Sequence, residues 1–186
     1  MLSVRYVLAI TGSSGIRYGV RLLEVFEGES ILVASETAKG MMEMEAGLTY
    51  EEVSAMADHV FEEGDLFAPI ASGSYQFDGM VVAPCSISTL SKMACGIADN
   101  LITRAAMVCL KEGRNLVLVS RETPLNAIIL ENQLKLARAG ATILPASPGF
   151  YHRPRTIEEM VDFVVGKILD QIGQDHQFFR RWDGME

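Results

Sequence analysis

The sequence contains few cysteines and few histidines, and this scarcity excludes several kinds of site. The three cysteines, Cys85, Cys95 and Cys109, stand far apart and form no C-x-x-C pair. The three histidines have no metal-ligand spacing either, so we expect no metal site. An odd number of scattered cysteines is typical of a reduced, cytoplasmic protein, and we expect that location.

Basic residues are outnumbered as well. The chain has 16 Lys and Arg against 24 Asp and Glu, a formal net charge of −8, which makes nucleic acid a poor partner. No apolar run is long enough to cross a membrane, and no basic segment followed by an apolar core suggests a secretion signal. With 186 residues and 49% hydrophobic content, we expect a single domain over 1–186 with a large core.

Short apolar runs alternate with stretches of helical periodicity. The runs predict strands at Val4–Ile10, Ile31–Ala34, Met80–Ala83, Leu116–Val119 and Ala141–Leu144. Helices are predicted at Ile16–Phe26, Thr37–Ala46, Thr49–Val60, Ile87–Ala94, Asn100–Lys111, Asn126–Arg138 and Ile157–Ile172. The alternation predicts βαβ units and a parallel sheet with helices on both faces, a three-layer, Rossmann-like α/β fold.

The segment Thr11–Gly15 joins the first strand to the first helix. Gly12 and Gly15 allow a close backbone approach, while Ser13 and Ser14 add hydroxyl donors. A helix start of this kind favours an anion, because its free N–H groups and its dipole point at one spot. The spacing is not G-x-G-x-x-G, so the dinucleotide fingerprint does not apply. The segment predicts a phosphate-bearing ligand, although many similar turns bind nothing.

The other strand ends carry polar or aromatic residues too. In a parallel sheet, ligands bind beyond the carboxyl ends of the strands, where Ser35 and the segments 84–89, 120–122 and 145–154 fall. Ser86 and Thr89 are either anion donors facing the first loop or caps of the helix that they begin.

Three cations suit a phosphate clamp. Arg104 and Lys111 stand seven residues apart on one helix face, and Arg121 follows a strand. The alternative is a solvated face on which Asp99 and Glu112 are their partners. The clamp interpretation predicts a local positive pocket within an acidic protein.

Two further residues have equally plain alternative roles. Glu45 ends an otherwise apolar helix, where a surface carboxylate is the simpler explanation. Tyr151 lies between glycine and prolines, which either present its ring at a defined place or pack it in a loop.

Several motifs together resemble the UbiX-type flavin prenyltransferases over nearly the whole chain. They are T-G-S-S-G-I-R-Y-G at 11–19, P-C-S-I-S-T-L at 84–90, D-N-L-I-T-R-A-A at 99–106, L-K-E at 110–112, R-E at 121–122, L-E-N at 130–132, P-G-F-Y-H-R-P at 148–154, V-D-F-V-V-G-K-I-L at 161–169 and R-W at 181–182. The resemblance implies a flavodoxin-like fold and a homo-oligomer, typically a dodecamer. It implies transfer of a dimethylallyl group from dimethylallyl phosphate to N5 and C6 of reduced FMN, without a metal. The prenylated FMN would serve a UbiD-type decarboxylase.

The resemblance also assigns site residues. It implies that FMN is bound by Gly12, Ser13, Ser14, Ser35, Ser86, Thr89 and Arg121. It places Ser14, Glu45, Glu122, Lys111 and Arg104 in the catalytic set, with Glu45 at a subunit interface. Binding of the prenyl phosphate falls to Tyr151, Lys167, Arg104 and Lys111.

Lys167 departs from the family pattern, which has arginine there, and lysine keeps the charge but loses the bidentate fork. Three other functions fit the same scaffold. An FMN-dependent reductase of pterins would need no second phosphate clamp. A cysteine-peptide decarboxylase would have P-A-S-A-N-T where this chain has Pro84–Thr89, and a histidine near the flavin. A non-catalytic flavin store is the remaining alternative.

Overall fold

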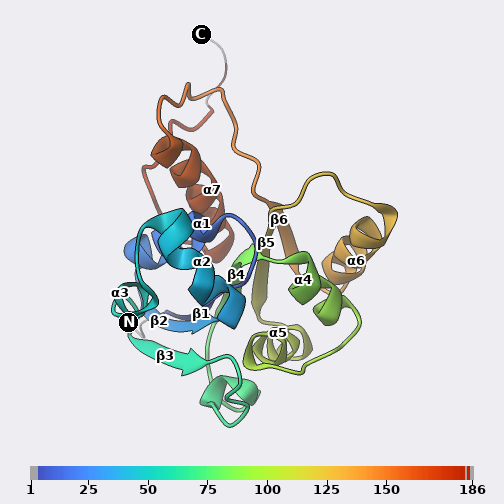
Figure 1. Ribbon diagram of the computed structural model, residues 1–186. Helices are drawn as coiled ribbons and strands as arrows, with labels where there is room; N and C mark the ends of the chain where they lie inside the picture. Colours follow the sequence, from blue (N-terminus) through green and yellow to red (C-terminus); the bar gives the residue numbers. More distant parts are fainter. Residues whose placement is uncertain (1–3, 183, 185–186) are drawn as a thin grey trace.

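The computed structural model describes residues 4–182 and 184, and it shows one parallel sheet between two layers of helices (Figure 1). The strands are β1 (Arg5–Ile10), β2 (Glu29–Ala34), β3 (His59–Glu62), β4 (Gly79–Cys85), β5 (Asn115–Ser120) and β6 (Thr142–Pro145). The helices are α1 (Ile16–Val25), α2 (Glu36–Ala46), α3 (Tyr50–Ser54), α4 (Ile87–Ala94), α5 (Leu101–Glu112), α6 (Ala127–Arg138) and α7 (Ile157–Ile172), with a 3₁₀ turn at Pro69–Ala71. The predicted three-layer, flavodoxin-like α/β fold is confirmed.

The strand order is β3-β2-β1-β4-β5-β6, and every neighbouring pair is parallel. The chain builds outward from β1 to β3 and then returns to build from β4 to β6 on the other side of β1. The order therefore reverses between β1 and β4, and such a switch point leaves a crevice at the carboxyl ends of the strands.

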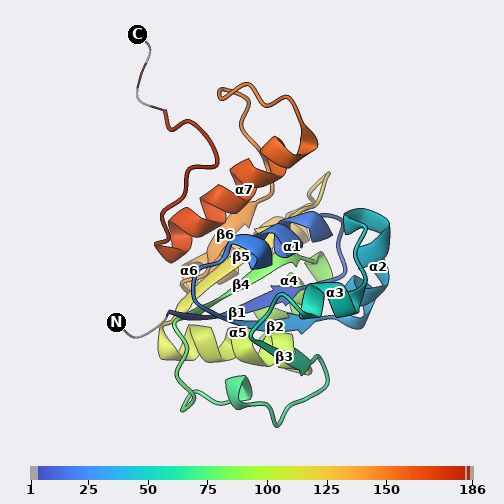
Figure 2. The same cartoon turned by 90° about the vertical axis from the view of Figure 1, so that its left-hand side faces the viewer.

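Alternating strand residues face two separate cores. On β1, Val7 and Ala9 pack in the cluster with α4 and α5, whereas Leu8 and Ile10 pack in the cluster with α1 and α7. Figure 2 shows α1 and α7 on one side of the sheet and α5 on the other. The strands read as continuous apolar runs because both of their faces are covered.

The predicted helix Thr49–Val60 begins where expected but is wrong beyond Ser54. Helix α3 ends at Ser54, and residues 59–62 form the edge strand β3, which pairs with β2. Residues 59–62, H-V-F-E, lack the continuous apolar run that is typical of a strand covered on both faces. Most residues of this edge strand are exposed, so its sequence does not need such a run. Thr49 and Glu52 do form the expected capping box, but the helix that they begin is short.

Gly19 allows α1 to lie against the end of β4. A Cβ at this position would lie 2.1 Å from the backbone oxygen of Ala83 and 2.9 Å from Cγ1 of Ile10. We expect Gly19→Ala to lower the free energy of unfolding by about 1–3 kcal/mol, because the helix must move off the sheet. Gly40→Ala on α2, where a Cβ meets nothing within 4 Å, is the control and should raise stability by about 1 kcal/mol. Urea unfolding of both variants measures this, and a Gly19→Ala protein as stable as wild type would contradict the packing argument.

Candidate functional site

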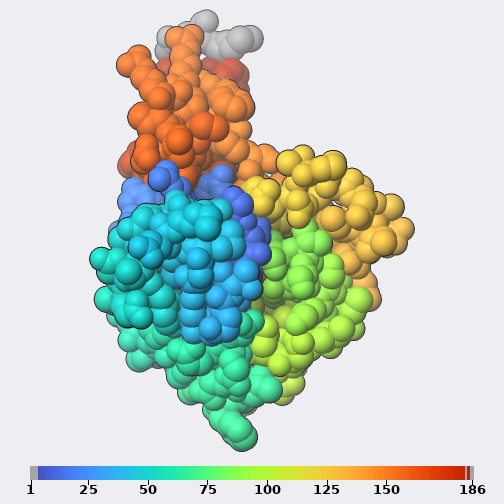
Figure 3. Space-filling view, viewed as in Figure 1, coloured from blue at the N-terminus to red at the C-terminus, as the bar shows by residue number. Residues whose placement is uncertain are grey.

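A cleft of about 530 Å³ opens at the carboxyl edge of the sheet, at the switch point. It lies between the segments coloured blue and those coloured green in Figure 3. Its lining residues are Gly12, Ser13, Ser14, Ser35, Thr37, Met41, Glu63, Ser86, Ile87, Ser88, Thr89, Lys92, Asn100, Arg121 and Glu122. All seven residues expected at FMN, together with Glu122, lie in this one cleft. The volume is ordinary for a small-molecule site.

Thr11 holds the two central loops of the cleft together. Its hydroxyl donates to the Pro84 carbonyl oxygen at 2.8 Å and accepts from the Ser86 N–H at 2.7 Å, and its side chain is buried. The loop after β1 and the loop after β4 are thereby fixed side by side. Gly12 follows, and a Cβ there would lie 2.4 Å from Cγ2 of Thr37, so only glycine fits.

Arg121 ties the end of β5 to the same loop. Its Nε donates to the Ser14 carbonyl oxygen at 3.0 Å, and the Ser13 hydroxyl donates to the Arg121 carbonyl oxygen at 3.4 Å. The guanidinium is therefore held beside the start of α1, where Arg121 lines the cleft. This position suits a cation that contacts a polar ligand in the cleft.

Ser35 and Ser86 are both helix caps and cleft residues. The Ser35 hydroxyl accepts from the Ala38 N–H at 3.2 Å, and the Ser86 hydroxyl accepts from the Thr89 N–H at 3.2 Å. The Ser86 hydroxyl also donates to Oγ1 of Thr89 at 2.9 Å. The capping role predicted for Ser86 is confirmed, and the N-termini of α2 and α4 both lie at the cleft.

Glu45 places a carboxylate at the start of α1. Its Oε2 accepts from the Gly15 N–H at 2.7 Å and from the Ile16 N–H at 3.0 Å. Partial burial acts to raise the pKa of Glu45, but these two N–H groups and the Ser14 side chain outweigh it, so the pKa is lowered. The side chain is thus ionised at neutral pH and lies beside Ser14 rather than on an unstructured surface.

Glu45 and four further predicted residues are not among the lining residues of the cleft. Arg104 donates from Nε to the Ala71 carbonyl oxygen at 3.0 Å, and Lys111 pairs with Glu112 at 2.7 Å. Lys111 lies in the last turn of α5 and therefore toward the opposite edge of the sheet. Glu112 is the partner that the solvated-face alternative gave Lys111, whereas Asp99 pairs with Lys92 instead of Arg104.

Tyr151 and Lys167 lie with the C-terminal segment. The Tyr151 ring centroid is 5.9 Å from that of Phe163 and 5.9 Å from that of Trp182, in edge contacts. Lys167 pairs with Asp170 at 3.1 Å. Arg104, Lys111, Tyr151 and Lys167 are all exposed to solvent, and none of them lines the cleft.

Asp170 anchors the C-terminal segment to α7. Burial acts to raise its pKa, but hydrogen bonds from Arg181 and Lys167 outweigh this and bring the pKa to about 2. The contact therefore stabilises the docked segment above about pH 4, and this stability is lost as the pH falls toward 2.

Trp182 is the only tryptophan and reports this docking. We expect its fluorescence to change between about pH 4 and pH 2 in the wild type. In Asp170→Asn the signal should resemble the low-pH signal already at pH 6. Identical titrations of the two proteins would contradict the anchoring role of Asp170.

The comparisons with known proteins decide the family. The model of the Flavoprotein family matches residues 1–169. The flavin prenyltransferase UbiX of Methanothermobacter thermautotrophicus is 48% identical, with 97% of this chain and 96% of that protein covered. This chain belongs to the UbiX family of flavoproteins.

Solved UbiX-like structures share the fold closely. AnUbiX (PadA1), solved in complex with FMN and dimethylallyl pyrophosphate, is 43% identical with a TM-score of 0.97, over 99% of this chain and all of that chain. A dodecameric FMN-dependent UbiX-like decarboxylase from Escherichia coli O157:H7 is 44% identical with a TM-score of 0.95, over 97% of this chain and 100% of that chain.

The sequence did not indicate every residue that lines the UbiX-like cleft. Thr37, Glu63, Lys92 and Asn100 are the polar and charged residues that were missed, and Met41 and Ile87 are apolar ones. Lys92 follows Thr89 by three residues on one helix face, a spacing that could have indicated it. The charged lining residues in the described part of the chain are Glu63, Lys92, Arg121 and Glu122, two of each sign. The expected excess of positive charge is therefore wrong for the cleft of a single chain.

Within residues 4–182 and 184, no group of three or more His, Cys, Asp or Glu side chains is arranged to hold a metal ion. In the same part of the chain, no helix combines the length and apolar character needed to span a membrane.

Proposed function

We propose that this chain transfers a dimethylallyl group from dimethylallyl phosphate to N5 and C6 of reduced FMN. The observation that carries the proposal is the meeting of Gly12–Ser14, Ser35, Ser86, Thr89 and Arg121 in one cleft at the switch point. The similarity to AnUbiX in complex with FMN and dimethylallyl pyrophosphate supports the same ligands here.

The cleft residues fit a flavin nucleotide. Serine hydroxyls and two helix N-termini supply donors for oxygen atoms, and Gly12 lets the ligand approach the backbone. Reduced FMN, when bound, supplies the nucleophilic ring atoms. Ser14 and Glu122 lie at the β1 and β5 side of the cleft, where we assign them proton movement at flavin N5.

The donor phosphate gains charge as the allylic C–O bond breaks, and fixed cations stabilise that charge. We assign this role to Arg104, Lys111 and Lys167, with the Tyr151 hydroxyl as a further donor. Since these side chains are exposed and lie away from their own cleft, we propose that a neighbouring copy in a homo-oligomer, a dodecamer, completes each site.

Exposed apolar side chains support assembly. Phe67 is fully exposed, and Ile128 on α6 is 70% exposed. Apolar surface of this kind is typical of contacts between protein chains. The dodecameric UbiX-like relative from Escherichia coli supports the same arrangement.

We further propose that residues 1–186 form a single flavoprotein domain that acts in the cytoplasm. Its product would be passed to a UbiD-type decarboxylase, which uses prenylated FMN.

Anaerobic incubation with reduced FMN tests the function and its alternatives. One sample receives dimethylallyl monophosphate and a second receives the diphosphate. We expect a flavin heavier by one C5H8 unit with one or both donors. A pterin reductase would instead oxidise reduced flavin with a pterin acceptor, and a storage protein would return unmodified FMN. Unmodified FMN with both donors would refute the transferase, and a third sample that contains a pterin would then distinguish the reductase from the storage protein.

A further inference from the structure

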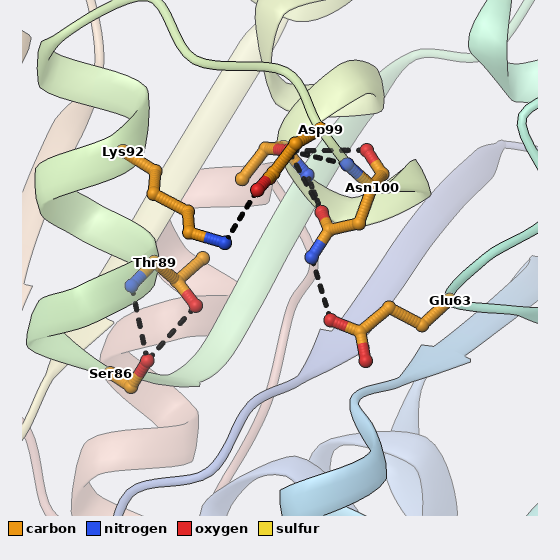
Figure 4. A network of polar contacts seen from close by, with 7 residues as sticks. Glu63, Ser86, Thr89, Lys92, Asp99 and Asn100 are labelled. Carbon is orange, nitrogen blue, oxygen red and sulfur yellow. Dashed lines mark hydrogen bonds and ion pairs between the residues drawn. The ribbon is translucent and has the colours of Figure 1, made fainter.

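A charge cluster lies at the β3 end of the cleft, outside the residues expected at FMN (Figure 4). The Lys92 ammonium lies 2.8 Å from Oδ2 of Asp99. The Asn100 amide donates to Oε1 of Glu63 at 2.6 Å. Glu63, Lys92 and Asn100 all line the cleft, so this cluster faces the ligand that the cleft holds.

The strand order places Glu63, at one end of this cluster, far from Arg121. Glu63 directly follows β3, whereas Arg121 directly follows β5, four strand positions away along the sheet edge. At the usual spacing between strands this separation is about 19 Å. FMN is elongated, with the ring at one end and the phosphate at the other. If the ring N5 lies beside Ser14 and Glu122, as the proposed function holds, the phosphate points toward the β3 end.

Glu63 places its own carboxylate at the start of α2, at this end of the cleft. Its Oε2 accepts from the N–H of Glu36, the first residue of α2, at 3.0 Å. A carboxylate in this position is stabilised by the helix N-terminus, as a phosphate oxygen would be. A phosphate arriving here would, however, lie near the negative charges of Glu63 and Asp99.

Lys92 can offset that repulsion. Among the cleft-lining residues that the structure describes, the cations are Lys92 and Arg121, and Arg121 is held at the Ser14 carbonyl oxygen. The Lys92 side chain is 37% exposed, so its flexible stem can turn into the cleft. Its partner Asp99 is 50% exposed and can be rehydrated when the lysine leaves.

We propose that Lys92 binds the terminal phosphate of FMN, exchanging the Asp99 carboxylate for the phosphate. The lysine then neutralises part of the phosphate charge next to Glu63, while Ser86 and Thr89 on the same helix supply hydroxyls. This role rests on the proposed function and adds a specific cation to it.

The comparison of FMN with riboflavin, which lacks the phosphate, tests the proposal. Flavin-free protein is titrated with each flavin, and the dissociation constants are measured by fluorescence quenching. We expect Lys92→Met to weaken FMN binding by about tenfold or more and to leave riboflavin binding unchanged. Lys92→Arg should retain most of the FMN affinity. Lys135→Met on the exposed face of α6 is the matched control and should change neither constant.

Asp99→Asn gives an independent test that does not remove the lysine. Freed from its carboxylate partner, Lys92 should bind FMN several-fold more tightly, with no change for riboflavin. Equal changes for FMN and riboflavin, or no change in either variant, would overturn the role of Lys92. If wild-type protein forms prenylated FMN while Lys92→Met binds FMN normally, only this inference fails. If wild-type protein binds neither flavin, both the proposed function and the role of Lys92 are refuted.

Discussion

Glu45→Gln is expected to leave FMN bound and to lower the rate of prenyl transfer by about a hundredfold or more. The glutamine oxygen can still accept from the N–H groups of Gly15 and Ile16, which lie 2.7 and 3.0 Å from Oε2 of Glu45. The loop therefore keeps its shape, whereas the negative charge beside Ser14 is lost. That charge is suited to stabilise the positive charge that develops on the allylic group.

The lowered pKa of Glu45 adds a pH dependence. Because the carboxylate is ionised above its lowered pKa, this group does not limit the rate near neutral pH, and its contribution is lost only as the pH falls through that value. Initial rates and FMN affinity should be measured together for the variant. Glu43→Gln, an exposed position on the same helix, is the control and should behave as wild type. Unchanged turnover in Glu45→Gln would refute the role of the carboxylate.

Mixing two inactive variants is expected to restore about a quarter of wild-type activity. Glu122→Gln damages the cleft, and Tyr151→Phe damages the surface that we assign to the donor phosphate. Glu122 lines the cleft, whereas Tyr151 packs against Phe163 and Trp182 on another part of the same chain. If each site combines the cleft of one copy with the tyrosine of another, random mixing leaves about one site in four with both residues intact.

Differently tagged variants can be co-expressed, and the hybrids isolated by both tags. Each homogeneous variant should be nearly inactive, and a hybrid of wild type with Glu122→Gln should show about half of wild-type activity. Hybrid activity no higher than that of the two variants alone would show that each chain forms its own complete site.

The sequence predicted the cleft residues that follow the central strands better than those that lie on a helix or follow the edge strand. Gly12–Ser14, Ser35, Ser86 and Arg121 follow strands that read as clear apolar runs, so the rule on strand ends brought them together correctly. Lys92 was not predicted to line the cleft, because it lies within α4 and not at a strand end. It reaches the cleft through its long side chain. Glu63 was not predicted to line the cleft, because it follows β3, an exposed edge strand whose sequence has no apolar pattern.

The pattern of one chain does not predict what Tyr151, Lys167 and Lys111 contact in an assembly of several copies. Their motifs imply a phosphate site, but within one chain they contact Trp182, Asp170 and Glu112. Contacts between copies are not encoded in the periodicity of one strand or helix. The resemblance to a family can assign such residues to a site. The structure of the assembled protein is what defines where they lie in it.

The mass of the flavin released after a single anaerobic reaction tests the central claim most directly. Wild-type protein is mixed with reduced FMN and dimethylallyl phosphate that carries ¹³C at all of its dimethylallyl carbons. The account predicts a flavin heavier by one fully labelled C5H8 unit, and no such product with Glu45→Gln. Release of unlabelled FMN alone from the wild type, under conditions in which the flavin is shown to bind, would contradict it.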